Sequence, residues 1–442
     1  MATRIADTPE YELWPRVVPE GWSGTLSLQG EYQHTAFRPG VAYRCELRSL
    51  QWHASSTRKK GPLRTTLEPT SDNILQIPFA PDVGGEWQLN VETESESINS
   101  KHLPCKIGLY VLPRSQYHLR PYIGELHAHS TGSDGWQEPA YPPIRGRQFG
   151  FDFFALSDHR HYHASRQMIE ALRGKLGTKM LLLAGEEMHP EAEEMSDPPA
   201  HFHYYHYVAV GQSESVRDAF LDNKESTQRE VDQIADEIRT RKSVAGLDVR
   251  SYAEGVWKMR RAKQYGGFVI FCHPYWAWSL NLDETTREQT FLDWEFDAVE
   301  VLSRADSSSI MPNRWSAEWA SGRRLPVVGV SDLHNWGPDS KLQHCTFVMA
   351  ESLTQEGIFD AIRDNRSLAF ENTGTQRFVG ASDLIDFAEF YFLRILPLKR
   401  RIMGLEAEFA FAALRGHSIH PSVLQSIDAS FDDLEKRLWS SD

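Results

Sequence analysis

At 442 residues the chain is longer than most single domains, and its composition, 40% hydrophobic and 24% charged, allows a sizeable buried core. Its formal net charge of -14 argues against a surface built for nucleic-acid backbones, so we expect no nucleic-acid substrate. Residues 1–10 lack the apolar core of a signal peptide, and no stretch is apolar enough to span a membrane, so we expect a cytoplasmic protein without a transmembrane segment.

Residues 1–115 are predicted to form a small antiparallel β-sandwich. Short runs of alternating apolar and polar residues, such as 24–28 and 87–91, are separated by turn signals. This part contains no cluster of catalytic residue types, so we expect it to have a structural role. Cys45 and Cys105 lie in two of the runs, and the dispersed spacing of all four cysteines favours reduced thiols, with a bridge between these two as the alternative.

Residues 116–372 alternate between short apolar runs and longer helical segments. The runs, among them 151–156, 180–184 and 267–271, are continuously apolar, as strands buried on both faces are. Helices are predicted at 164–176, 226–241, 252–265, 316–323 and 353–366. This alternation predicts an α/β fold with a parallel sheet or barrel.

Residues 373–442 are predicted to be a helical C-terminal extension. The apolar stretch 384–396 is followed by Lys399, Arg400 and Arg401, and we expect a helix packed on the barrel. A membrane-surface helix and a dimer contact stay open as alternatives. Self-association through the β-domain or these helices would make the protein a homo-oligomer.

Residues of metal-ligating types follow five of the apolar runs. They are His127 and His129, Asp158 and His159, Glu186 and Glu187, His273, and Asp332 and His334. The carboxyl ends of barrel strands meet at one face, where active sites are built, so these side chains are expected to converge. Each alone has a structural alternative, such as helix capping by Asp332. Together they indicate a polynuclear metal site.

These motifs resemble those of the polymerase and histidinol phosphatase (PHP) superfamily, whose members share a distorted (β/α)7 barrel that binds two or three metal ions. The matching segments are 127–134, 158–159, 185–187, 206–211, 273–274 and 332–334, within a resemblance that covers about residues 120–370. The β-domain ahead of the barrel makes the layout most similar to that of CehA/McbA-like metallohydrolases.

The resemblance implies a set of metal ligands in this chain. They are His127, His129, Asp134, His159, Glu187, His206, His273, Asp332 and His334. Glu186 is the alternative to Glu187, and the choice of His206 rests on spacing, with His189, His201 and His203 nearby. The implied cofactors are two or three divalent ions, manganese, zinc or iron. The family pattern places His127, His129, Glu187 and Asp332 on one ion, Asp134, His159 and His334 on a second, and His206 and His273 on a third that Glu187 bridges.

The resemblance implies a metal-dependent hydrolase, and we expect a phosphoesterase that acts on a small phosphorylated molecule, with a hydroxide bridging the metal ions as nucleophile. Arg160, where the family often has Asn, and Arg304 are predicted to hold phosphate oxygens. Arg160 is also a catalytic candidate, and His161 or His163 is expected to protonate the leaving group.

An aromatic wall is predicted after His273. Tyr275, Trp276 and Trp278 would suit an apolar or ring-bearing substrate, which keeps hydrolysis of a carboxylic ester, carbamate or amide open as the alternative. A non-catalytic metal-binding protein is a third hypothesis, and it predicts lost ligands, whereas every ligand type of the pattern is present in this chain.

Overall fold

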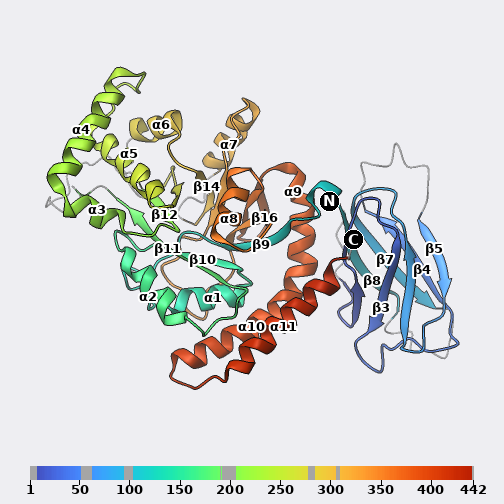
Figure 1. Cartoon of the computed structure of the whole chain (residues 1–442). Coiled ribbons are helices and arrows are strands. Elements are labelled where there is room, and N and C mark those ends of the chain that lie inside the picture. Colours follow the sequence, from blue (N-terminus) through green and yellow to red (C-terminus); the bar gives the residue numbers. More distant parts are fainter. Residues whose placement is uncertain are drawn as a thin grey trace. The chain divides into compact units, whose positions relative to one another are not determined.

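The computed structural model describes residues 7–50, 62–93, 103–189, 191, 206–276, 284–304 and 309–440 (Figure 1). Contacts divide the chain into two units. The first consists of Met1–Arg120, Ile385–Ile402 and Gln425–Asp442, and the second of Pro121–Leu384 and Met403–Leu424. The predicted C-terminal part, 373–442, is therefore shared between the two units.

The first unit, called here the β unit, contains two sheets. One has the order β1 (Tyr11–Trp14), β3 (Gly24–Gly30), β6 (Ile74–Phe79), and the other has the order β2 (Val17–Pro19), β8 (Cys105–Leu112), β7 (Gly85–Thr93), β4 (Tyr43–Ser49), β5 (Leu63–Leu67). All pairs are antiparallel except β2–β8. Alternate residues of both sheets bury one core, which includes Leu28, Ile77, Leu47 and Leu89. The four cysteines are free and buried.

C-terminal residues complete the β unit. The chain ends in α9 (Ser382–Phe390), a π-helical turn (Tyr391–Ile395), α10 (Leu396–Leu414) and α11 (Pro421–Leu438). The ring of Tyr110 on β8 lies 5.0 Å from that of Phe387. The amide of Arg16 donates to the Leu438 carbonyl over 2.8 Å, and Trp439 forms a parallel bridge with Val17. We predicted that 384–396 packs on the barrel; residues 385–396 belong instead to the β unit, where the Tyr110 ring of β8 packs against Phe387 and Phe390 on their apolar face.

The second unit, called here the barrel unit, is built on one ten-stranded sheet. Its order is β15 (Val327–Val330), β14 (Ala298–Ser303), β13 (Phe268–Phe271), β12 (Tyr207–Val210), β11 (Leu181–Met188), β10 (Phe153–Leu156), β9 (Arg120–Glu125), β16 (His344–Ala350), β17 (Ser367–Asn372), β18 (Gln376–Gly380). The sheet curls until the residues after β15 reach those after β9, where Asp332 N donates to His127 O over 3.0 Å and Ala128 bridges Leu333. The result is a nearly closed, barrel-like sheet.

Strand β12 interrupts the expected parallel order. Pairs β9–β10, β10–β11, β13–β14 and β14–β15 are parallel, whereas β12 is antiparallel to both β11 and β13. An antiparallel neighbour can be reached by a direct connection, whereas a parallel neighbour needs a crossover. The mixed α/β class is confirmed, and the finer (β/α)7 layout stays a prediction.

Helices cover the outside of this sheet (Figure 1). They are α1 (Tyr141–Phe149), α2 (Tyr162–Leu172), α3 (Val216–Asp222), α4 (Lys224–Thr240), α5 (Val249–Gln264), α6 (Glu284–Asp293), α7 (Ile310–Ala320) and α8 (Gln355–Arg363). The five helices predicted in this part correspond to α2, α4, α5, α7 and α8. Among the described helices, none is both long enough and apolar enough to cross a membrane.

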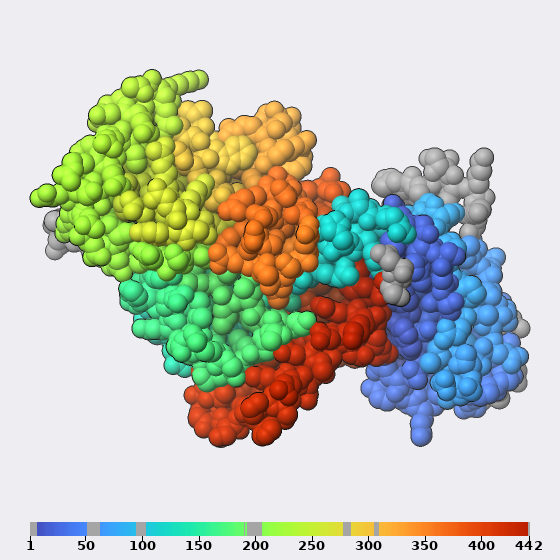
Figure 2. Space-filling view, in the orientation of Figure 1, coloured from blue at the N-terminus to red at the C-terminus, as the bar shows by residue number. Residues whose placement is uncertain are grey.

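The C-terminal part of the barrel unit packs on α1. Arg147 of α1 and Glu406 of α10 are both buried, and the Arg147 Nε atom donates to Glu406 Oε2 over 2.6 Å. Gly177 N donates to the other carboxylate oxygen over 2.6 Å. Figure 2 shows the red surface of residues 403–424 against the green surface of the first helices of this unit, where the Tyr141 ring lies 4.9 Å from that of Phe411.

Candidate metal centre

The predicted ligands come from one rim of the barrel-like sheet. His127 and His129 follow β9, His159 follows β10, Glu187 lies in β11, His273 follows β13, and Asp332 and His334 follow β15. His206 instead precedes β12. Because β12 runs antiparallel to its neighbours, the residue before it lies at the same rim as the ends of β11 and β13. The reversal of this strand therefore accounts for a ligand candidate ahead of a strand.

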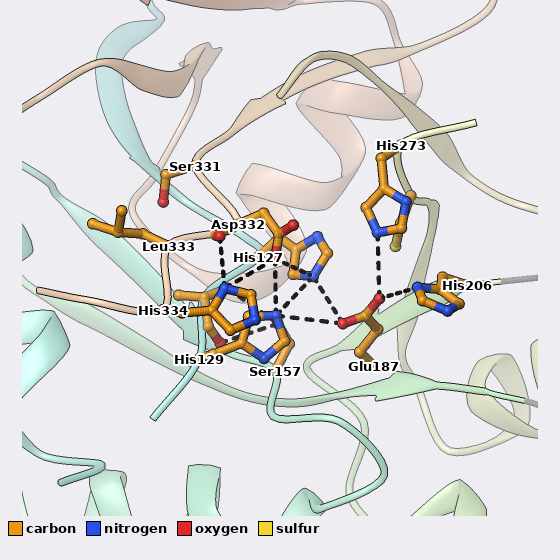
Figure 3. A network of polar contacts seen from close by, with 12 residues as sticks. His127, His129, Ser157, Glu187, His206, His273, Ser331, Asp332, Leu333 and His334 are labelled. Atoms are coloured by element: carbon orange, nitrogen blue, oxygen red, sulfur yellow. Dashed lines mark hydrogen bonds and ion pairs between the residues drawn. The ribbon is translucent and has the colours of Figure 1, made fainter. Parts of the chain in front are cut away.

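The Glu187 carboxylate lies at the middle of the cluster (Figure 3). Its Oε2 atom is 3.1 Å from His127 Nε2, 3.3 Å from His129 Nε2 and 2.8 Å from His159 Nδ1. Its Oε1 atom is 2.8 Å from His206 Nδ1 and 3.5 Å from His273 Nε2. One carboxylate oxygen thus faces each side of the cluster, which is the arrangement that a carboxylate shared by two metal ions requires.

His127, His129 and Asp332 form one corner of the cluster. The Nε2 atoms of the two histidines are 3.2 Å apart, and Asp332 Oδ1 lies 3.4 Å from the first and 3.0 Å from the second (Figure 3). Two imidazole nitrogens that face each other beside two carboxylate oxygens suit a shared cation, to which every one of these atoms can donate a lone pair.

Asp134 marks a more open corner. Its Oδ1 atom is 3.3 Å from His334 Nε2 and 3.5 Å from His159 Nε2, and its side chain is 59% exposed. Ligand atoms of Asp134, His129, His159 and His334 lie within 4.8 Å of one another. Because the other corner is buried, a substrate would meet the cluster on the Asp134 side.

Unsatisfied buried atoms support the fit of a metal. Within the described residues, Glu187 Oε1, His206 Nδ1 and His273 Nδ1 are buried without a hydrogen-bond partner of good geometry. Buried polar atoms normally have such a partner, and exceptions indicate an ion or a functional strain. Mixed imidazole and carboxylate donors suit Zn²⁺, Mn²⁺ or Fe²⁺.

Neighbouring charges shift the pKa values of Glu187 and His159 in the direction opposite to the shift caused by burial. Burial favours the neutral carboxylic acid of Glu187, but His159, His127 and His206 hold its pKa well below the usual range. Burial lowers the pKa of His159, but the Glu187 and Asp134 carboxylates raise it to about 10. The two carboxylates thus hold a proton on His159, and a bound metal ion would displace that proton.

Two buried glutamates support the cluster, and sequence analysis missed both. Glu300 on β14 lies with Oε1 2.6 Å from His127 Nδ1, and its Oε2 atom accepts from His273 N over 2.8 Å. Glu125 on β9 accepts from His127 N and from Ser331 N, each over 3.0 Å, and burial raises the pKa of Glu125 to about 7. The sequence signal that could have identified them is a glutamate within an otherwise apolar strand, because a glutamate is rarely buried unless its carboxylate has a partner.

Asp158 organises the loop that follows β9. Its Oδ1 atom accepts from Ser130 N over 2.8 Å and from Ser133 Oγ over 2.7 Å, and its Oδ2 atom accepts from Ser130 Oγ over 2.6 Å. The two residues of the Asp-His pair after β10 therefore have different roles. His159 belongs to the cluster, and Asp158 fixes the loop that carries Asp134.

The sequence left open which glutamate and which histidine of the β11–β12 segment enter the cluster. Glu186 turns away, since Val216 N donates to it over 2.5 Å at the start of α3, whereas Glu187 faces the histidines. His189 lies in the cluster together with His206: its Nε2 atom is 2.8 Å from His159 Nδ1, and its ring stacks on that of His206 at 4.0 Å. His201 and His203 lie outside the described residues.

The predicted proton donors and arginines are placed differently. Arg160 stays beside the cluster, because its amide donates to the Glu187 carbonyl over 2.9 Å, and His161 N donates to Asp158 O over 3.2 Å. His163 is 64% exposed and pairs with Asp218 at 2.9 Å. Because α2 begins at Tyr162, the helix carries His163 outward, and the structure does not bring it to the cluster.

Arg304 lines a separate cavity of about 340 Å³ with His344, Glu371 and Arg377, and none of the described residues that line it is a predicted ligand. The predicted grip of Arg304 on a phosphate at the metal centre is therefore not supported by its position. The bulge between Glu300 and Leu302 of β14 shifts the inward and outward alternation before the strand reaches Arg304.

The predicted aromatic wall is reduced to one described residue. The Trp276 ring lies 5.3 Å from that of His273 and 5.9 Å from that of His206. Tyr275 instead accepts from Arg314 Nη1 over 3.0 Å and packs against helices outside the sheet, so it is not part of the wall. Trp278 lies outside the described residues.

No protein-family model and no curated protein matches the chain. Similar solved structures include a two-domain protein from Bacteroides vulgatus that contains a predicted PHP-like metal-dependent phosphoesterase, at 19% identity and a TM-score of 0.40 over 62% of this chain and 70% of that one. An amidohydrolase from Chromobacterium violaceum is 18% identical, with a TM-score of 0.33 over 49% of this chain and 89% of its own. A lesion-specific endonuclease from Pyrococcus furiosus is 14% identical, with a TM-score of 0.34 over 59% and 58%. A PHP-like protein is thus among the structures similar to this chain, and at these identities and TM-scores the likeness says nothing of its substrate.

Proposed function

We propose that this chain is a metal-dependent hydrolase that cleaves phosphoesters of small molecules. The observation that carries the proposal is the buried Glu187 carboxylate, whose oxygens lie within 3.5 Å of nitrogens of His127, His129, His159, His206 and His273. Removing the charged Glu187 carboxylate from water costs several kcal/mol of folding free energy. Divalent ions bound between the carboxylate and the imidazoles would offset that cost.

The proposed ligands fall into three sets, and Glu187 would serve the first and the third of them. His127, His129, Glu187 and Asp332 would hold one ion, Asp134, His159 and His334 a second, and His206 and His273 a third. Bound ions of this kind lower the pKa of water and neutralise charge on substrate oxygens, so no serine or cysteine nucleophile is required. A centre with several cations suits a phosphate group, which offers several anionic oxygens.

Residues outside the ligand set would orient ligands and substrate. Glu300 beside Nδ1 of His127 keeps the proton on that nitrogen, so the Nε2 lone pair faces the centre. Arg160 follows His159 directly and is our candidate for contact with phosphate oxygens. His161, whose backbone lies beside Asp158, is our candidate for the proton donor to the leaving group.

The alternative is hydrolysis of a carboxylic ester, carbamate or amide at the same centre. Trp276 favours it, because its ring beside His273 and His206 offers an apolar wall for a ring-bearing substrate. Metal ions polarise carbonyl oxygens as they do phosphoryl oxygens, so the ligand set alone does not separate the two reactions.

The deciding experiment combines a substrate panel with one variant. The purified protein, stripped of metal and then supplied with Mn²⁺ or Zn²⁺, is assayed on aryl phosphomonoesters and phosphodiesters beside aryl esters and carbamates. We expect metal-dependent cleavage of a phosphoester. We also expect Glu187→Gln to lower kcat/KM more than about a hundredfold, because even the loss of a residue that only hydrogen-bonds to a metal ligand lowers activity by up to about that factor.

Glu356→Gln serves as the matched control, since Glu356 is an exposed glutamate on α8. Its activity should equal that of the wild type. Turnover of carbonyl substrates alone would reject the phosphoesterase, and wild-type activity in Glu187→Gln would reject the proposed centre.

A further inference from the structure

Trp136 is the most exposed large apolar side chain of the described residues, at 73%. It follows Asp134 by two positions, and its backbone amide donates to the His334 carbonyl over 2.8 Å. Trp136 is therefore anchored between two predicted ligands, at the open corner of the cluster. No sequence motif singled it out.

The loop that carries Trp136 is fixed on both sides. Gly135 N donates to Ser130 O, and Thr131 N donates to Gln137 O, each over 2.8 Å. The Gln137 side chain donates to Asn335 Oδ1 over 3.1 Å, which ties the loop to the residue after His334. Gly135 also packs so closely that an added Cβ would lie 2.6 Å from Ser130 N. The backbone is thus held in place while the indole stays in water.

Single exposed apolar residues are common on protein surfaces and need no explanation by themselves. The position of Trp136 distinguishes it from the others. Leu405, 60% exposed, lies on helix α10, whereas Trp136 adjoins the partly exposed ligands Asp134 and His334. An aromatic ring on a rigid loop contributes contact area with little loss of conformational entropy on binding.

We propose that Trp136 is a stacking platform that selects phosphoesters with an aromatic ring close to the phosphate. The proposal rests on the proposed function and names its substrate class. The phosphate would lie at the Asp134 and His334 corner, and the flat ring of the alcohol portion would stack on the indole. Stacking on tryptophan favours planar π systems and tolerates differences in their edge groups, so aryl and nucleobase rings both fit.

The test compares benzyl phosphate with ethyl phosphate, because both release a primary alcohol and differ in the ring. In Trp136→Ala, we expect the ratio of kcat/KM for benzyl over ethyl phosphate to fall about tenfold, mainly through a higher KM for benzyl phosphate. Trp136→Phe, which keeps a flat ring, should retain most of the ratio. Leu405→Ala is the control for loss of an exposed apolar side chain, and its ratio should match the wild type.

Failure of this inference is separable from failure of the proposed function. An unchanged ratio in Trp136→Ala would overturn the stacking role while leaving the phosphoesterase intact. If the wild type hydrolyses neither ester, the wider phosphoester panel decides the proposed function, and calorimetry of the Mn²⁺-loaded protein with benzylphosphonate and ethylphosphonate decides the role of Trp136. Tighter binding of benzylphosphonate that Trp136→Ala abolishes supports that role, and equal or undetectable binding of the two overturns it.

Discussion

The Glu300 carboxylate lies 2.6 Å from Nδ1 of His127, and both side chains are fully buried. A carboxylate on the far nitrogen of a metal-binding histidine fixes the ring orientation and makes the near nitrogen a stronger donor. Glu300 also accepts the amide of His273, so one side chain positions two strand ends of the cluster. Burial opposes protonation of His127, yet Glu300, Asp332 and Glu187 raise its pKa well above the usual range.

Replacing Glu300 by Gln should weaken metal binding about 10- to 100-fold, because the amide keeps the volume but loses the charge that orients His127. Titration of stripped protein with Zn²⁺ against a competing chelator measures the change directly. Glu288→Gln is the control, since Glu288 pairs with Arg314 on the outer helices. Equal affinities in wild type and Glu300→Gln would show that Glu300 does not position the ligands.

Metal removal should destabilise the barrel unit. A ligand that binds only the folded state adds about 2.7 kcal/mol at a concentration of one hundred times its Kd, so Mn²⁺ or Zn²⁺ should raise Tm and a chelator should lower it. Differential scanning calorimetry with and without metal measures the shift. In the double variant His127→Ala and His129→Ala the metal-dependent shift should vanish; a shift of wild-type size there would mean that the ions bind elsewhere.

Glu406→Ala should lower the free energy of unfolding by about 3–5 kcal/mol, because it removes the carboxylate that accepts from the buried Arg147 Nε, and the Asp152 carboxylate, 4.0 Å from Nη1, is too far away to accept a hydrogen bond in its place. Chemical denaturation followed by circular dichroism measures the loss. Glu408 lies two residues further along the same helix and is exposed, so Glu408→Ala should change stability by less than about 0.5 kcal/mol. Similar losses of unfolding free energy in both variants would show that the buried Arg147–Glu406 pair has no special importance for stability.

Ionised Glu371 should stabilise the folded state, and this stabilisation should be lost at acid pH. Burial opposes ionisation of Glu371, but hydrogen bonds and charge from Arg377, with His344 nearby, hold its pKa below the ordinary 4.5. The folded state therefore binds fewer protons than the unfolded state, and the stabilisation is present above about pH 4.5 and is lost as pH falls through the lowered pKa.

Urea unfolding midpoints of metal-free protein, measured between about pH 6 and about pH 3, test this dependence. The decline toward acid should be shallower in Glu371→Gln than in the wild type, because the amide does not titrate. Parallel declines in the two proteins would contradict the prediction.

Several features of the cluster could be predicted because strand ends converge whatever the details of packing. The pairs His127/His129 and Asp332/His334 are spaced so that each reaches one side of an extended segment, and the structure brings them together. His206 was chosen by spacing alone; the reversed direction of β12 explains why a residue before a strand reaches the same rim.

Other residues could not be predicted because their partners are distant in sequence. Nearness to His159 suggested His163 as a proton donor, but the start of α2 directs it to Asp218. An apolar face on the stretch 384–396 indicates that it is covered, but not that Tyr110 of β8 covers it. A carboxylate within an apolar strand predicts that Glu300 is buried and has a polar partner. That this partner is His127 follows only from the curl of the sheet.

The division of the C-terminal residues between the two units also sets an order of events during synthesis. Domains commonly fold as they leave the ribosome, N-terminal part first. Here Arg16 and Val17 lack their C-terminal partners until residues 438–439 are made, because the Arg16 amide donates to the Leu438 carbonyl and Val17 bridges Trp439. The barrel unit likewise waits for Glu406 to meet Arg147. Neither unit can reach its final packing before these residues have been made, so a ribosome stalled before residue 385 would hold both units without their C-terminal contacts.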